Sequence, residues 1–231
     1  MGLVSKFKKL KRSKLGIEKN RFNMIEQQIR TWNVLDEKIL NLFRINLREN
    51  YVPDAYQALA FADIEIPIGS SASMLPPKLE AKILEELKPK KNMLALHVGT
   101  GSGFFSALLA SQVKKVITID IQPKLLADAK KRHLENNIKN IEYVCANGFN
   151  GYYEKTPYDL IIYTASHIHE PPGIREQLNV GGKLFLFEGN QAIQYGKLIT
   201  RMSDSEFKIK NLFEAVVPSL VESWEPSKFI F

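Results

Sequence analysis

The residues best suited to chemistry are a cluster of glycines and an aspartate that follows it along the chain. The segment GTGSG places Gly99, Thr100, Gly101 and Gly103 together, and Asp120 lies 17 residues beyond the last of them. Glycines let a backbone turn sharply and approach a ligand closely, and a carboxylate after the next strand can bind ribose hydroxyls. The pattern predicts an adenosine-type nucleotide site. The alternative is a tight turn beside a surface aspartate.

The spacing of the glycines separates the nucleotide cofactors from one another. Dinucleotide sites carry G-x-G-x-x-G, whereas here Phe104 stands where the third glycine would fall. The chain has no G-x-x-x-x-G-K-[ST] sequence, and no Lys or Arg lies within residues 97–113 to meet a phosphate. An adenosine site without phosphate partners suits S-adenosyl-L-methionine (SAM), whose sulfonium is a cation, so SAM is the predicted cofactor.

These residues need a scaffold of alternating strands and helices. Continuous apolar runs that alternate with amphipathic helices are typical of a parallel sheet covered on both faces, a Rossmann-like α/β fold. Two later segments without an intervening long helix predict antiparallel strands at the C-terminal side. The predicted strands cover residues 93–98, 116–121, 141–145, 158–164, 181–189, 196–202 and 207–217, and the helices between them cover 102–112 and 123–136.

A helical extension precedes this core. Apolar residues at helical spacing predict a helix from Phe22 to Trp32, a second after Asp36, and a short third turn over residues 53–61. Residues 66–77 contain three prolines, one glycine and three serines, which predicts a loop. Pro77 then opens the next helix, because proline fits the first helical position.

The net charge of +7 is concentrated at the N-terminus, where residues 1–21 carry eight basic side chains and one acidic one. The rest of the chain is neutral, so the positive net charge of the protein does not indicate a nucleic-acid-binding domain. The tail is either a poorly ordered, solvated terminus or a weak contact for an anionic surface. The single cysteine and the lack of a secretory signal predict a cytoplasmic protein. No apolar run approaches the roughly 18 residues of a membrane span, so membrane insertion is not expected.

The sequence resembles the protein-L-isoaspartate O-methyltransferase family of class I, SAM-dependent methyltransferases. The resemblance implies a class I methyltransferase fold, SAM as methyl donor, and a protein or peptide substrate that is methylated on an isoaspartyl carboxylate. Together with the charge pattern it divides the chain into a basic, poorly ordered tail (1–21) and one methyltransferase domain (22–231). The domain comprises a helical cap with the acceptor loop (22–90) and a SAM-binding α/β core (91–231). The matching segments are RENYVPDAY (48–56), IPIG…P (66–77), LHVGTGSGF (96–104), ANG (146–148), PYDLIIYTA (157–165), QLNVGGKL (177–184) and VVPSL (216–220).

The resemblance also implies roles for single residues. Asp120 would hold the ribose, Asn147 would lie near the adenine, and Thr164 would border the site. The full set of implied cofactor contacts is His97, Gly99, Thr100, Gly101, Gly103, Asp120, Asn147 and Thr164.

Three positions depart from the family pattern. His97 replaces an acid, and is either a satisfied core histidine or a SAM contact. Asn147 replaces an aspartate, although its carbonyl can still accept a hydrogen bond. Leu75 replaces the family's catalytic serine, which leaves Ser73 as the retained hydroxyl and the candidate catalytic residue. Two rival functions remain open: a paralogue that methylates another acceptor, and a SAM-binding protein without turnover.

The other histidines indicate no metal site. His167 and His169 stand two residues apart without further ligands at suitable spacing, so no metal is expected. His133 falls late in a lysine-rich helix and is expected on the solvated surface.

Overall fold

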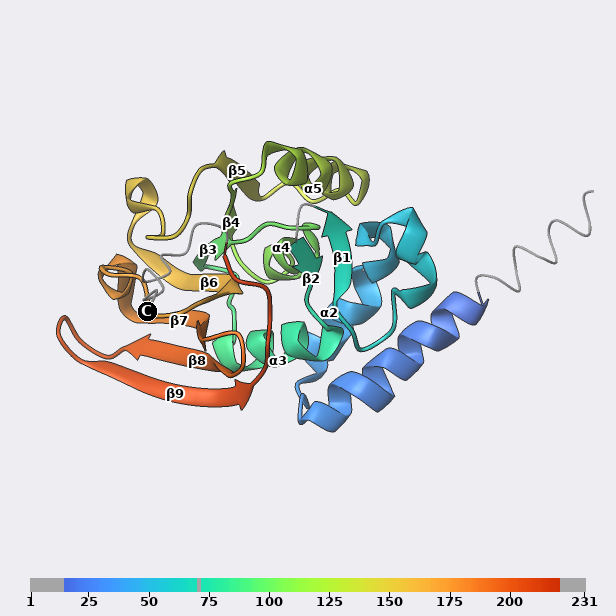
Figure 1. The fold of residues 1–231 in the computed structure, drawn as a ribbon, viewed down its shortest axis with the longest axis horizontal. Coiled ribbons are helices and arrows are strands. Elements are labelled where there is room, and N and C mark those ends of the chain that lie inside the picture. Colours follow the sequence, from blue (N-terminus) through green and yellow to red (C-terminus); the bar gives the residue numbers. More distant parts are fainter. Residues whose placement is uncertain (1–14, 70–71, 221–231) are drawn as a thin grey trace, which may run out of the picture.

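The computed structural model describes residues 15–69 and 72–220, which form a seven-stranded sheet with helices packed on it (Figure 1). The strand order is β5-β4-β3-β6-β7-β8-β9, and a separate two-stranded sheet pairs β1 with β2. The five strands from β5 to β7 run parallel, whereas β8 and β9 are antiparallel to their neighbours. The large sheet consists of β3 (Leu94–Val98), β4 (Lys115–Asp120), β5 (Ile141–Cys145), β6 (Tyr158–His167), β7 (Leu178–Gly189), β8 (Gln194–Arg201) and β9 (Phe207–Glu214).

Alternation along the strands gives the sheet two apolar faces. Helices α3 (Pro77–Leu87), α4 (Phe104–Ala110) and α5 (Pro123–Glu135) lie on one side of the sheet (Figure 1). The opposite face is covered by connecting segments and the 3₁₀ helices η5 (Tyr153–Lys155) and η6 (Arg175–Gln177). The predicted Rossmann-like α/β class is confirmed, with short 3₁₀ turns rather than long helices on the second face.

The N-terminal extension is helical and packs beside α3. Residues 15–23 are α-helical and continue into the π-helical η1 (Met24–Ile29) and the 3₁₀ helix η2 (Arg30–Trp32). The next element is α2 (Glu37–Ile45), and the 3₁₀ helices η3 (Arg48–Tyr51) and η4 (Asp54–Leu59) complete the extension. No helix in the described ranges is long and apolar enough to cross a membrane.

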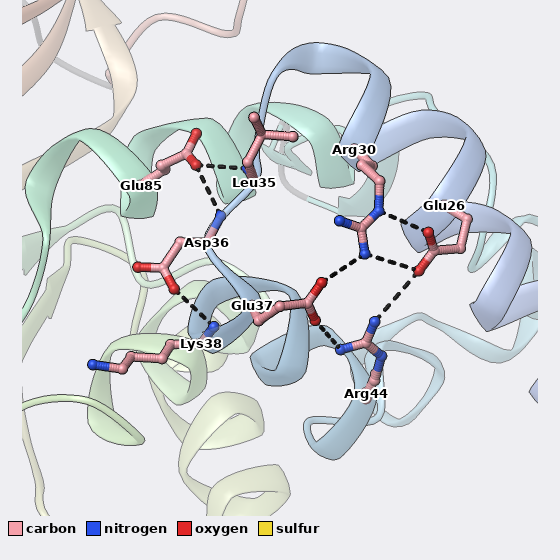
Figure 2. Close-up of polar contacts among 8 residues, drawn as sticks. All are labelled: Glu26, Arg30, Leu35, Asp36, Glu37, Lys38, Arg44 and Glu85. Atoms are coloured by element: carbon pink, nitrogen blue, oxygen red, sulfur yellow. Dashed lines mark hydrogen bonds and ion pairs between the residues drawn. The ribbon is translucent and has the colours of Figure 1, made fainter.

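Polar contacts fix the turn between η2 and α2 (Figure 2). One Glu85 carboxylate oxygen accepts hydrogen bonds from the amides of Leu35 (2.7 Å) and Asp36 (3.2 Å). The Asp36 side chain in turn caps α2 by accepting from the Lys38 amide at 2.8 Å. Four alternating charges, Glu26, Arg30, Glu37 and Arg44, form an exposed network beside this turn (Figure 2).

The boundary expected at residue 22 differs from the structure. Residues 15–21, assigned above to the basic tail, are helical, and Arg21 pairs with Glu49 of η3. The Arg21 guanidinium also lies 5.8 Å from the ring centre of Phe61. An arginine that contacts both Glu49 and Phe61 requires an ordered backbone. The helix therefore begins further towards the N-terminus than the charge pattern of the sequence indicated. Residues 1–14 lie outside the described residues.

The predicted loop at residues 66–77 is largely a hairpin. Ile66–Gly69 (β1) and Ala72–Met74 (β2) pair antiparallel, with Ile66 opposite Met74 and Pro67 opposite Ser73. The prolines and serines suggested a loop, but the buried side chains of Ile66 and Met74 hold the pair on the core. Pro77 begins α3 as predicted.

Candidate active site

A cleft opens at the carboxyl ends of the parallel strands, where ligands bind in open α/β sheets. It encloses about 700 Å³ of empty space, which includes open solvent. We call the residues at and just after the strand ends, together with Leu125 of α5, the floor: Val98, Gly99, Gly101, Ile119, Asp120, Ile121, Gln122, Leu125, Ala146, Asn147, Gly148, Thr164 and Ala165. The outer wall consists of Ala72 and Ser73 of β2 and of Pro218, Ser219 and Leu220.

The glycine loop follows the end of β3, where its amides donate hydrogen bonds to the neighbouring strand, β4. The amides of Gly99 and Thr100 donate to the carbonyl of Ile119 at 2.9 and 3.1 Å. Gly99 has a φ of +93°, and a Cβ there would lie 3.0 Å from the Thr164 hydroxyl. The position therefore requires glycine, and the loop leaves an open surface on the floor.

Two members of the predicted loop lie behind the cleft rather than in it. Gly103 has a φ of +88°, and a Cβ there would come within 2.9 Å of His133 and Ala129 on α5. Gly103 thus allows α4 to pack closely on α5. The Thr100 hydroxyl is buried and lies 2.7 Å from that of Thr118. Both residues shape the loop, and neither lines the cleft.

Asp120 ends β4 with its carboxylate on the floor. Its Oδ2 accepts a hydrogen bond from the Gly101 amide and its Oδ1 accepts one from the Gln122 amide, both at 3.0 Å. Each carboxylate oxygen can accept more than one hydrogen bond. The two amides therefore fix the carboxylate and leave acceptor capacity towards the cleft.

Asn147 lies on the floor next to the end of β5. Asp120 and Cys145 are opposite each other in the β4–β5 register, so the chain after β5 emerges beside Asp120. The Asn147 Oδ1 accepts from the Phe149 amide at 2.9 Å, which fixes the side chain within its turn.

His97 is fully buried beneath the floor and does not line it. Its Nδ1 lies 2.7 Å from the Ser106 hydroxyl and its Nε2 lies 3.0 Å from the Thr164 hydroxyl. The Thr164 hydroxyl donates to the Gly99 carbonyl at 3.0 Å, so the His97 Nε2 carries the proton and donates to Thr164. Burial lowers the pKa of His97 to about 3, which keeps the ring neutral. Of the two readings of His97, this geometry matches the satisfied core histidine.

The outer wall presents Ser73 to the cleft but turns Leu75 away from it. Leu75 is 4% exposed and packs in the main hydrophobic core, and it does not line the cleft. The chain leaves β2 at Met74, and both Met74 and Leu75 then face the core. Replacing a serine by leucine at position 75 is therefore accommodated by core packing, not by contact with the cleft.

A buried arginine fixes this end of the hairpin. Arg48 donates to the carbonyls of Leu75 (2.7 Å) and Ala60 (3.1 Å) and pairs with the Glu80 carboxylate. Arg48 and Glu80 are 1% and 3% exposed, and the guanidinium lies 5.1 Å from the centre of the Phe104 ring. The charge pattern of the sequence gave no sign of this pair, although Arg48 opens the segment RENYVPDAY.

The C-terminal part of the outer wall is held by a buried glutamine. The Gln194 Nε2 donates to the Val217 carbonyl and the Ser166 hydroxyl, each at 3.1 Å, and its Oε1 accepts from the Val217 amide at 2.8 Å. Sequence reasoning missed both Gln194 and the contribution of residues 218–220 to the site. The segment VVPSL was the available signal, because it matched the family far from the glycine loop.

His133 and His167 take structural positions. His133 is buried, not solvated as expected, because its ring lies between the Gly103 carbonyl (Nε2, 2.8 Å) and the Tyr143 hydroxyl (Nδ1, 2.8 Å). His167 is 1% exposed and contacts the rings of Phe149 and Tyr163. Within the described residues no group of three His, Cys, Asp or Glu side chains could hold a metal ion.

Comparison with known proteins agrees with this geometry. The model of the family protein-L-isoaspartate(D-aspartate) O-methyltransferase (PCMT) matches residues 19–223. Protein-L-isoaspartate O-methyltransferase 2 of Shewanella sediminis is 34% identical over 185 residues, which cover 80% of this chain and 76% of that protein. The protein-L-isoaspartate O-methyltransferase of Methanospirillum hungatei is 35% identical over 185 residues, covering 80% and 85%.

A solved structure has the same fold. The crystal structure of a Plasmodium falciparum protein-L-isoaspartate O-methyltransferase in complex with S-adenosyl-L-homocysteine superimposes with a TM-score of 0.74 at 19% identity. The match covers 86% of this chain and 96% of that one.

The sheet order, the glycine loop and the carboxylate at the end of β4 define a class I, SAM-dependent methyltransferase. The family model spans most of the chain, and the curated relatives exceed 30% identity over 80% of it. The chain therefore belongs to the protein-L-isoaspartate(D-aspartate) O-methyltransferase family.

Proposed function

We propose that this chain transfers the methyl group of SAM to the carboxylate of isoaspartyl residues in proteins or peptides. One observation carries the proposal. A single cleft joins a nucleoside-type floor, with Asp120 and the glycine loop, to an outer wall that presents the Ser73 hydroxyl. The names of the curated relatives support isoaspartate as the acceptor.

The donors and acceptors on the floor fit SAM. The Asp120 carboxylate would take the ribose hydroxyls, and Asn147 would lie at the adenine edge. Gly99 and Gly101 would form the cradle, because a Cβ at either would approach Thr164 or Ile68 within 3.0 or 3.2 Å. The described lining residues include no Lys, Arg or His that would bind a phosphate, which favours SAM over a nucleotide phosphate. When bound, SAM supplies an activated methyl group on a positively charged sulfur.

The chain's own task is to align the acceptor. A carboxyl group with an ordinary pKa of about 3.3–3.9 is already ionised at neutral pH, so the reaction needs no general base. Alignment of reacting groups can contribute up to about 7–11 kcal/mol to lowering a barrier. Ser73 would donate a hydrogen bond to the carboxylate, which makes it the candidate catalytic residue. Neutral His97 would hold Thr164 and the Gly99 carbonyl in place beneath the floor.

A second candidate function follows from Leu75. Its side chain lies in the core, so the outer wall lacks the serine hydroxyl that the family resemblance assigns to this position. A change at that position favours a paralogue that methylates another acceptor. A SAM-binding protein without turnover would be the further outcome if no acceptor is found.

Two further proposals concern the surroundings of the enzyme. The basic residues of the N-terminal tail would contact an anionic surface weakly, and removal of residues 1–14 should abolish any salt-sensitive binding to anionic vesicles while leaving SAM binding intact.

We also propose a cytoplasmic location, for which the one cysteine, free and exposed, is the supporting observation.

Methyl transfer to a defined peptide tests the proposed function. The protein would be incubated with methyl-labelled SAM and a peptide that contains one isoaspartyl residue, with the aspartyl form of the same peptide as control. Label on the isoaspartyl peptide alone is the expected result. Label on neither peptide, with SAM still bound, would contradict the isoaspartyl assignment and leave the paralogue or the protein without turnover.

A further inference from the structure

Among the described residues, few side chains around the cleft can donate a hydrogen bond to an acceptor. Among the described lining residues the only charged side chain is Asp120, so an acceptor carboxylate would meet no cationic side chain among them. Three hydroxyls of the described residues line the cleft: those of Ser73, Thr164 and Ser219. Thr164 already donates to the Gly99 carbonyl and contacts the His97 ring. The hydroxyls of Ser73 and Ser219 have no hydrogen-bond partner within the described ranges.

Ser219 occupies a fixed place on the outer wall. Residues 218–220 run parallel to the end of β6, where Ser166 and Ser219 form an isolated bridge. The Ser166 amide donates to the Pro218 carbonyl and the Leu220 amide donates to the Ser166 carbonyl, both at 2.9 Å. The Gln194 side chain holds the preceding residue, Val217, through its amide and carbonyl. Ser219 is therefore held by main-chain bonds of its neighbours.

The pattern of this bridge leaves the polar groups of Ser219 available. In a parallel pair, alternate residues of a strand direct their N–H and C=O groups towards the partner strand and away from it. A residue whose two chain neighbours form the hydrogen bonds to the partner strand therefore directs its own N–H and C=O away from that strand. The bridge uses groups of Pro218 and Leu220, so the Ser219 amide points away from β6. Ser219 thus offers an amide N–H and a hydroxyl from one residue, and neutral donors of this kind bind a carboxylate well.

We propose that Ser219 binds the carboxylate of the methyl acceptor from the C-terminal side of the outer wall, together with Ser73 from the hairpin side. The inference rests on the proposed function, because it names a residue that would recognise the same acceptor. It also explains how the cleft can hold an anion although the side chain of Leu75 faces the core. Ser219 would replace the hydroxyl that position 75 lacks.

The test uses a pair of variants that differ only in a hydroxyl. Ser219→Thr keeps the hydroxyl, and Ser219→Val has nearly the same shape without it. Ser219 is exposed, so neither change should disturb folding. A hydrogen bond to a charged group is typically worth enough to change kcat/KM on an isoaspartyl peptide at least about tenfold. We expect that loss in Ser219→Val and Ser219→Ala, and activity within about threefold of wild type in Ser219→Thr.

A binding readout separates recognition from turnover. Calorimetry would measure the affinity of the isoaspartyl peptide for the protein saturated with S-adenosylhomocysteine, and the affinity for S-adenosylhomocysteine itself. We expect Ser219→Val to weaken peptide binding and leave S-adenosylhomocysteine binding unchanged. Equal peptide affinity and kcat/KM in the Thr and Val variants would overturn the inference while the function stands. A wild-type protein that neither methylates nor binds the isoaspartyl peptide would overturn the proposed function, and the role of Ser219 with it.

Discussion

The floor and the outer wall of the cleft are built in different ways. The floor joins the ends of adjacent parallel strands, and their register alone brings Asp120 beside the chain that leaves Cys145. The outer wall joins segments far apart in the sequence, β2 and residues 218–220, and each depends on a buried side chain, Arg48 or Gln194. Strand pairing makes the floor robust. Residues of the outer wall can change without disturbing the floor. A change of methyl acceptor would therefore arise in the outer wall.

The largest expected effect is the loss of the buried pair behind the hairpin. Arg48→Met removes the partner of the Glu80 carboxylate, and an unpaired buried charge costs about 3–5 kcal/mol of the free energy of unfolding. Urea unfolding measures this loss. Arg30→Met is the matched control, because Arg30 belongs to the exposed network of Figure 2 and should change stability little. Equal effects of the two variants would mean that Arg48 does not anchor the wall.

A smaller loss is expected at Leu75. Leu75→Ser removes a buried apolar side chain and places a hydroxyl in the core, which should cost about 2–5 kcal/mol. Because the side chain faces the core, the new hydroxyl should not raise kcat on an isoaspartyl peptide. Ser73→Ala provides the contrast, with little loss of stability and lower activity. A gain in kcat for Leu75→Ser at unchanged stability would show that position 75 reaches the cleft.

Two buried histidines sharpen the comparison through pH. Burial lowers the pKa of His97 to about 3 and that of His167 to about 4, both below the unfolded value of about 6.5. Below pH ~6.5 the two histidines bind protons in the unfolded chain but stay neutral in the folded protein. The contribution of the two neutral histidines to the free energy of unfolding is therefore fully present above pH ~6.5. It falls as the pH drops towards their pKa values in the folded protein, by up to about 1.4 kcal/mol per pH unit for each histidine.

The two histidines should respond differently to substitution. The ring nitrogens of His167 have no hydrogen-bond partner among the described residues, whereas both nitrogens of His97 have one. His167→Phe should therefore be neutral or stabilising at pH 7, and His97→Phe should destabilise because the hydrogen bonds of the ring to Ser106 and Thr164 are lost. Each should reduce the acid sensitivity of urea unfolding. An unchanged pH dependence in both would refute the burial argument.

The smallest effect is expected at the glutamine that holds the C-terminal segment. Gln194→Met removes its hydrogen bonds to Val217 and should let residues 218–220 shift. We expect KM for the peptide to rise severalfold, with SAM affinity unchanged, because the floor does not depend on Gln194. Steady-state kinetics and calorimetry provide the two values. A matched loss of SAM affinity would mean that wall and floor are one unit.

Sequence reasoning succeeded where local pattern determines structure. The apolar runs predicted β3 to β7, and the glycine spacing placed the floor, because both features depend on residues close together in the chain. It failed where packing between distant segments decides the outcome. The direction of Leu75, the burial of His133 under Gly103 and the helix over residues 15–21 all depend on partners tens of residues away.

The outer wall shows the same limit most clearly. Ser73 was indicated by the family resemblance of residues 66–77, whereas Ser219 lies far along the chain in VVPSL, with no local pattern that indicates a site. The bridge to Ser166 and the hydrogen bonds of Gln194 to Val217 bring it to the cleft. A match to a family in a segment remote from the glycine loop was the one hint that this stretch contributes to function.

SAM binding to three proteins tests the division between floor and wall most directly. Calorimetry would compare the wild type, Asp120→Ala and Ser219→Val. We predict that SAM binds the wild type, that Asp120→Ala weakens binding by about 1.5–3 kcal/mol because hydrogen bonds to a charged group are lost, and that Ser219→Val binds SAM as the wild type does. Wild-type affinity in Asp120→Ala, or an equal loss in Ser219→Val, would contradict the account.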